Sequence, residues 1–129
     1  MNITNLLYIL LSLLFFTVGV VNGHDFINAS NFNDKIAKDI VAVEFWADWN
    51  KSNEFSELKS LKDATVYRVD IMHCTSLQSD YEVVSVPTII IFESGKEKDR
   101  FAANIMFQLE ADKKDVQKSI DKIMLAKFN

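Results

Sequence analysis

The alternation of hydrophobic and polar positions predicts a sheet with four strands. Two short runs, residues 41–46 and 88–92, are apolar on both faces, which is typical of central strands covered on both sides. Strands are predicted at 41–46, 65–71, 88–92 and 100–103, the last returning antiparallel to 88–92 after a turn at 94–96.

Helices are predicted where apolar residues recur every three or four positions. The clearest follows Asp112, where Asp115 completes a capping box and Val116 and Ile120 continue the helical spacing. The other helices are expected to begin at Ser30 and Asn31, at Asn50 or Ser52, and at Leu77. Helices and strands thus alternate along the chain, which predicts an α/β sandwich.

Composition narrows the class of protein. A length of 129 residues suits one domain, and 12% aromatic residues is too many for an intrinsically disordered chain. The formal net charge of −4 argues against a nucleic-acid-binding protein, which normally needs a basic surface. A single cysteine excludes an internal disulfide. We expect no cofactor and no metal site.

The first 23 residues are predicted to be a signal peptide preceding one domain over 24–129. They carry no Lys, Arg, Asp or Glu, and residues 6–21 are almost continuously apolar. Cleavage is expected between Gly23 and His24, which places the domain in an extracytoplasmic compartment, either periplasmic, secreted or lumenal. The start lacks the usual basic residue, so the alternative is an uncleaved membrane anchor.

Two segments resemble thioredoxins. Residues 43–49 (VEFWADW) are similar to the strand and turn that lead into the thioredoxin active site. Residues 81–88 (YEVVSVPT) are similar to the segment that contains the cis-proline of that family. The resemblance extends over nearly all of residues 26–126. It implies a thioredoxin-like three-layer sandwich, with a mixed sheet of four to five strands between helices.

The active-site motif itself is absent. Thioredoxins continue with Cys-Gly-Pro-Cys, whereas this chain has Asn50, Lys51, Ser52 and Asn53. Dithiol exchange needs a thiolate that attacks and a second thiol that resolves, so we expect no catalytic residue at these four positions. The Asn50 amide is expected to cap the second helix instead, and that helix should be about two turns shorter than in the family.

Glu44 matches the buried acid that thioredoxins use to move a proton at their resolving cysteine. Arg68, on the next predicted strand, matches a basic position of the family. We favour a buried ion pair between the two, because no nearby thiol would need a proton shuttle. A remnant of the shuttle is the alternative.

Cys74 is the sole thiol and lies away from the motif position. A lone cysteine in an exported protein indicates either an intermolecular disulfide or a quiet buried thiol, and the second is the more common case. A thiol-dependent oxidoreductase or isomerase that acts through Cys74 alone is a third hypothesis.

The binding groove of the family is the feature that this chain retains. The resemblance implies that Val86, before Pro87, offers its backbone to an extended peptide, with Trp49 as one wall. Ala103 stands where the family has a glycine and should narrow the groove. A purely structural role of Pro87 is an equally weighted alternative.

These residues predict a redox-inactive, exported module that binds an extended peptide or a protein. The alternatives are the enzyme acting through Cys74, with a possible disulfide to a partner, and a membrane-tethered structural subunit if the leader stays attached. No nucleic-acid partner is expected.

Overall fold

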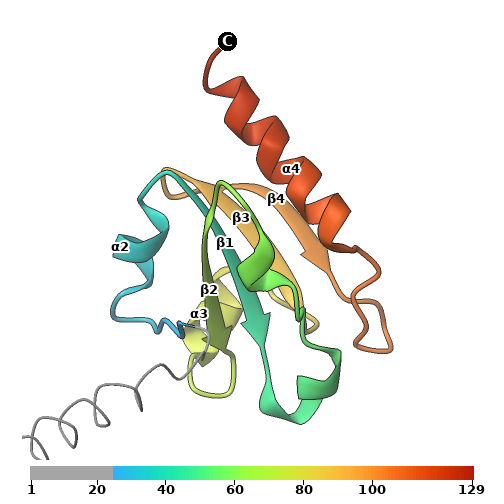
Figure 1. Cartoon of the computed structure of the whole chain (residues 1–129). Helices are drawn as coiled ribbons and strands as arrows, with labels where there is room; N and C mark the ends of the chain where they lie inside the picture. The colour runs from blue at the N-terminus through green and yellow to red at the C-terminus, as the bar shows by residue number, and fades with distance from the viewer. Residues whose placement is uncertain (1–24) are drawn as a thin grey trace, which may run out of the picture.

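The computed structural model describes residues 25–129, so the predicted leader and its cleavage site lie outside the described residues. The sheet has four strands in the order β2-β1-β3-β4 (Figure 1). The strands are β1 (Ile40–Trp46), β2 (Thr65–Asp70), β3 (Thr88–Glu93) and β4 (Lys96–Ala102). β2 runs parallel to β1, and β3 is antiparallel to both β1 and β4, so the sheet is mixed as predicted.

β4 begins four residues earlier than the predicted strand at 100–103, because the charged residues 96–99 also belong to it, and the turn before it is one residue shorter than expected. Glu93 pairs with Lys96, which leaves Ser94 and Gly95 as a two-residue hairpin loop. Both loop residues have positive φ, 50° and 82°, as the hairpin turn that matches strand twist requires.

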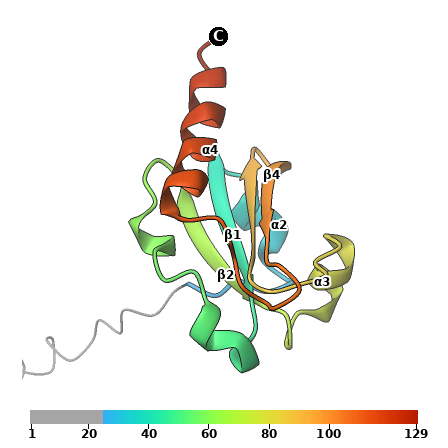
Figure 2. The same ribbon diagram turned by 90° about the vertical axis from the view of Figure 1, so that its right-hand side faces the viewer.

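Helices cover both faces of the sheet, which confirms the α/β sandwich. They are α2 (Phe32–Ile36), α3 (Thr75–Asp80) and α4 (Lys113–Ala126). Figure 2 shows α4 on one side of the sheet and α2 and α3 on the other. Successive β1 side chains point to opposite faces, so Val41, Val43 and Phe45 pack with α2 and α3, while Ile40 and Ala42 pack with α4.

The helix predicted after Asn50 or Ser52 does not form. Two 3-10 segments replace it, η1 (Asp48–Asn53) and η2 (Leu58–Ser60). The chain between them is extended at Glu54 (φ −60°, ψ 153°), and the Phe55 N–H donates to the Glu44 carboxylate over 2.9 Å. The prediction was wrong because a buried side chain, invisible to local periodicity, takes the N–H that a helix would use.

The capping box of α4 is present as predicted. The Asp112 side chain accepts a hydrogen bond from Asp115 N, and the Asp115 side chain accepts one from Asp112 N, both over 2.9 Å. These hydrogen bonds favour the charged form, so the pKa of the Asp112 carboxyl lies below its usual value. No helix within residues 25–129 has both the length and the apolar character that crossing a membrane requires.

The strand directions bring four connecting segments to one end of the sheet. β1, β2 and β4 all end there and β3 begins there, since β2 is parallel to β1 and the other neighbours are antiparallel. We call this the carboxyl end; it lies at the bottom of Figure 1. The segments that meet there are 47–53, 71–74, 83–87 and 103–109.

Candidate functional site

Asn50 is buried at the carboxyl end and joins two other segments. Its Nδ2 donates to the backbone oxygens of Val86 and Phe107, each over 3.0 Å. Its Oδ1 accepts from Asn53 Nδ2 over 2.8 Å. The expectation that this amide caps a helix is therefore wrong, because a cap needs the side-chain oxygen to accept from a backbone N–H, whereas Oδ1 accepts from the Asn53 side chain.

The rest of the motif position carries no nucleophilic thiol. Lys51 and Ser52 are outside the core, and Asn53 is half-buried through its bond to Asn50. An amide neither attacks a disulfide nor transfers electrons. Chemically, this place can hold backbone segments together by hydrogen bonds but cannot exchange disulfides.

Two residues of the expected groove, Val86 and Pro87, are buried, whereas Ala103 is half-buried and Trp49 is exposed. The Val86–Pro87 peptide bond is cis, Val86 is only 2% exposed and Pro87 is buried. Ala103 N donates to Pro87 O over 3.0 Å, and Ser85 Oγ donates to Ala103 O over 2.9 Å. Ala103 is thus tied to the cis-proline segment, while the Val86 carbonyl is already bonded to Asn50.

A turn at residues 104–108 is joined to Val86 through Asn50, and sequence reasoning missed it. Asn104 Oδ1 accepts from the N–H groups of Met106 and Gln108, over 2.9 and 3.1 Å, which closes the turn on itself. Phe107 has a positive φ of 58° and its ring meets the ring of Trp49 edge-on at 5.1 Å. The only signal in the sequence is a run of three large apolar residues, 105–107, between Asn104 and Gln108.

Large hydrophobic side chains are exposed around this site. Trp49 is 55% exposed in η1, and Ile105 is 96% exposed at the tip of the 104–108 turn. We call the exposed large hydrophobic residues of the four segments the apolar rim: Trp49, Met72, Val84, Ile105, Met106 and Phe107. Most of the large hydrophobic side chains exposed in residues 25–129 belong to it, which marks the carboxyl end as a surface suited to contact.

Glu44 and Arg68 lie together behind the site. Arg68 Nη2 is 2.7 Å from Glu44 Oε1, and the two side chains are 3% and 0% exposed. Burial raises the pKa of the Glu44 carboxyl above its usual value, while the Phe55 N–H and Arg68 counteract part of that rise. Arg68 also lies 3.5 Å from Glu54, whose Oε2 accepts from Trp46 Nε1. The groups that contact this ion pair are therefore structural, and none of them is a thiol.

Cys74 is buried at the start of α3, 6% exposed, within the core on the α2 and α3 side. The neighbouring His73 is exposed and its Nδ1 lies 2.8 Å from Asp70 Oδ2. No group of three or more His, Cys, Asp or Glu side chains within residues 25–129 is arranged to hold a metal ion.

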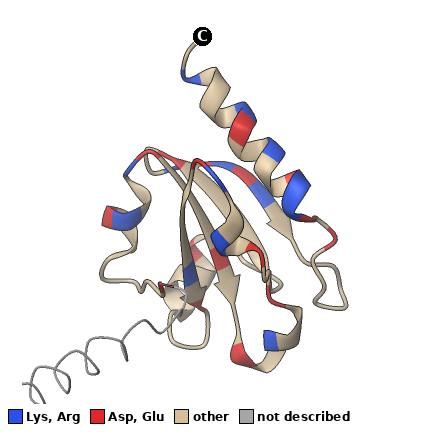
Figure 3. Ribbon diagram, viewed as in Figure 1, with Lys and Arg blue, Asp and Glu red and all other residues tan. Residues whose placement is uncertain are grey.

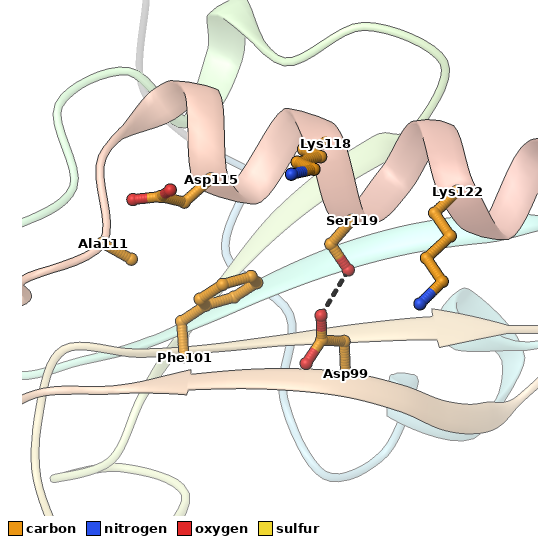
Figure 4. Close-up of a pocket in the computed structure, with 7 residues that line it drawn as sticks. All are labelled: Asp99, Phe101, Ala111, Asp115, Lys118, Ser119 and Lys122. Atoms are coloured by element: carbon orange, nitrogen blue, oxygen red, sulfur yellow. Dashed lines mark hydrogen bonds between the residues drawn. The ribbon is translucent and has the colours of Figure 1, made fainter.

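The pocket shown in Figure 4 lies between α4 and β4, away from the predicted site residues. Lysine and aspartate side chains both line it, and Ser119 Oγ donates to Asp99 Oδ2. In the charge distribution of Figure 3 the two signs are interspersed along α4 and β4. This mixed lining selects no charged ligand.

Comparisons with known proteins agree with the fold. A family model described as Thioredoxin matches residues 24–122. The thioredoxin of Chlamydia trachomatis is 31% identical over 80 residues, which are 57% of this chain and 78% of that protein. The thioredoxin of Mycoplasma genitalium is 37% identical over 70 residues, 50% of this chain and 69% of that protein.

Solved structures match as well. A mutant thioredoxin from Halobacterium salinarum superposes with a TM-score of 0.63 at 24% identity, covering 76% of this chain and 88% of that one. A thioredoxin from Malassezia sympodialis gives a TM-score of 0.58 at 19% identity, covering 74% and 87%. Likeness at these identities shows the shared fold.

Proposed function

The chain belongs to the thioredoxin family, and from that premise we propose that it is an exported, redox-inactive module that binds a protein or an extended peptide. The observation that carries the proposal is the apolar rim, which surrounds a site where Asn50 stands in place of a thiol. The carboxyl end of the sheet thus keeps an exposed apolar surface but has no thiol at the motif position.

The chemistry of the site supports the absence of disulfide exchange. Exchange requires an accessible thiolate, whereas the motif position holds amides, a lysine and a serine. Cys74 is buried in the core, which disfavours the hypothesis of an enzyme acting through it and the hypothesis of a disulfide to a partner.

The apolar rim supports binding of a polypeptide rather than a small molecule. Its side chains come from four separate segments and are exposed to solvent. Aromatic and methionine side chains of this kind are enriched at protein interfaces. A partner with apolar side chains would bury the apolar rim, and the removal of this surface from water would favour binding.

Binding is tested with reduced, carboxymethylated lactalbumin, an unfolded chain, as the probe. We expect Met72→Glu and Val84→Glu, which lie outside the 104–108 turn and its contacts, each to weaken its binding by about tenfold or more, since each places a charge in the contact. Leu125→Glu is the matched control, because Leu125 is 67% exposed on α4. Equal binding by all variants would contradict the proposed surface.

Redox inactivity is tested by insulin reduction with dithiothreitol. The protein should not raise the rate above that of dithiothreitol alone. A rate increase that disappears in Cys74→Ser would instead establish the enzyme hypothesis and overturn this part of the proposal.

A further inference from the structure

The backbone position before Pro87 is closed although it carries unused hydrogen-bonding capacity. Val86 is 2% exposed and its carbonyl accepts from Asn50 Nδ2 over 3.0 Å. No residue among those at 25–129 accepts a hydrogen bond from the Val86 N–H. Buried backbone N–H groups are nearly always paired, so this one indicates a position at which a partner is missing.

The segment joined to this position through Asn50 is the turn at residues 104–108, which we call the strap. Its own bonds make it compact, since Asn104 N donates to Gln108 O over 2.9 Å and Phe107 N to Asn104 O over 3.0 Å. Its attachments to the site are few. They are the bond from Asn50 Nδ2 to Phe107 O and the edge-on contact between the rings of Trp49 and Phe107.

Asn50 links the strap to the closed position through a single nitrogen. One amide hydrogen goes to Val86 O and the other to Phe107 O. A group that displaces Asn50 from Val86 O therefore acts on the same nitrogen that holds the strap. The backbone of Phe107, at a φ of 58°, is in a conformation that non-glycine residues rarely adopt without such support.

We propose that the strap is an autoinhibitory cover, held shut by Asn50, over a site at which an extended peptide segment pairs with Val86. The peptide donates a backbone N–H to Val86 O in place of Asn50 Nδ2, and its carbonyl accepts from the Val86 N–H. This inference rests on the proposed function for the identity of the ligand, but the strap and its attachment to Asn50 are properties of the free protein.

Amide hydrogen exchange of the free protein tests the strap directly. In Asn50→Asp the side chain keeps its size, loses both donors and directs a carboxylate at two carbonyl groups. Exchange at Val86 and Gln108 should rise on the order of ten- to a hundredfold, while exchange at Ile90 in β3 stays unchanged. Ser52→Ala, in the same segment, is the matched control and should leave all three unchanged.

Two results would overturn the inference. One is unchanged exchange at Val86 and Gln108 in folded Asn50→Asp. The other is equal acceleration at Ile90, because Asn50 would then support the whole fold rather than the strap.

The unaltered protein provides a second measurement if Asn50→Asp does not fold. There Val86 and Gln108 should exchange together through one opening, well before Ile90, and exchange of Val86 only together with Ile90 would overturn the inference. No ligand takes part in either measurement. A strap that opens as expected in a protein that binds no polypeptide would contradict the proposed function alone.

Discussion

At the scale of single residues, Arg68 is a charged side chain in a buried position. Its guanidinium is 3% exposed and contacts Glu44 through both Nε and Nη2, over 3.1 and 2.7 Å. Two buried charges stabilise the fold only as a pair, because the partner left behind after one is removed has neither water nor a counter-ion.

Arg68→Met should therefore lower the free energy of unfolding by about 3–5 kcal/mol at neutral pH. Burial already raises the pKa of Glu44, so the folded state favours the protonated carboxyl. The stability that this preference contributes is present at pH values below the ordinary pKa of a glutamate, and it is lost as pH rises through the raised pKa. Arg68 lowers that pKa, so in its absence the free energy of unfolding falls further as pH rises. Urea denaturation at several pH values should show the smallest difference from the unaltered protein at acid pH.

Lys98→Met is the control for this experiment. Lys98 is 44% exposed and lies 4.0 Å from Glu93, so the free energy of unfolding should change by less than about 0.5 kcal/mol. If the difference between Arg68→Met and the unaltered protein grows toward acid pH, the expected direction of the pH dependence is wrong.

At the scale of elements, features set by local sequence could be predicted, whereas features set by long-range contacts could not. The capping box at Asp112 was visible because both of its partners lie within four residues of sequence. The helix after Asn50 was predicted wrongly because Glu44, on β1, takes the Phe55 N–H. The strap was missed for the same reason, since its attachment to Asn50 joins segments far apart in the chain.

The candidate site was predictable in its members but not in its state. Motif resemblance identified Asn50, Val86 and Pro87, yet it did not show that Val86 packs into the core and that its carbonyl is bonded to Asn50. A pattern of residue types gives the position of a groove, whereas the three-dimensional packing of side chains decides whether the groove is open.

Asp112→Ala should shorten α4 from its N-terminus and lower the melting temperature by a few degrees, because the backbone N–H of Asp115 loses its partner. The pKa of Asp112 is lowered in the folded state. The stabilising effect of its carboxylate is therefore present at pH values above the ordinary pKa of an aspartate, and it is lost as pH falls through the lowered pKa. Thermal unfolding followed by circular dichroism should show the two proteins converging at strongly acid pH.

Asp121→Ala removes a charge from the same helix without removing a cap. Its melting temperature should stay close to that of the unaltered protein. An equal drop in both variants would attribute the effect to net charge instead of the capping box.

At the scale of the whole molecule, the described chain is fastened to the sheet immediately after the predicted cleavage site. Asp25 O accepts from Arg68 N over 3.1 Å, and Ile27 N donates to Arg68 O over 2.9 Å. Phe26 forms an isolated parallel bridge with Arg68 beside β2. Cleavage between Gly23 and His24 would therefore leave every one of these bonds intact.

The full chain, expressed in a host with a secretory pathway, should yield a protein whose intact mass corresponds to residues 24–129. Signal peptidase accepts a small-x-small pattern before the cut, and Val21 and Gly23 flanking Asn22 resemble it. Mass spectrometry of the exported fraction decides the outcome. A product that retains Met1 would instead support the membrane-anchored alternative.

The direction of α4 has a practical consequence for studying binding. The helix ends at the pole opposite the carboxyl end, and its Leu125 side chain is 67% exposed there (Figure 1). Because the natural Cys74 is buried, Leu125→Cys would introduce the most reactive sulfhydryl in the described chain. Coupling through it to a sensor chip would orient every immobilised molecule alike, with Trp49 and the strap facing the flowing analyte.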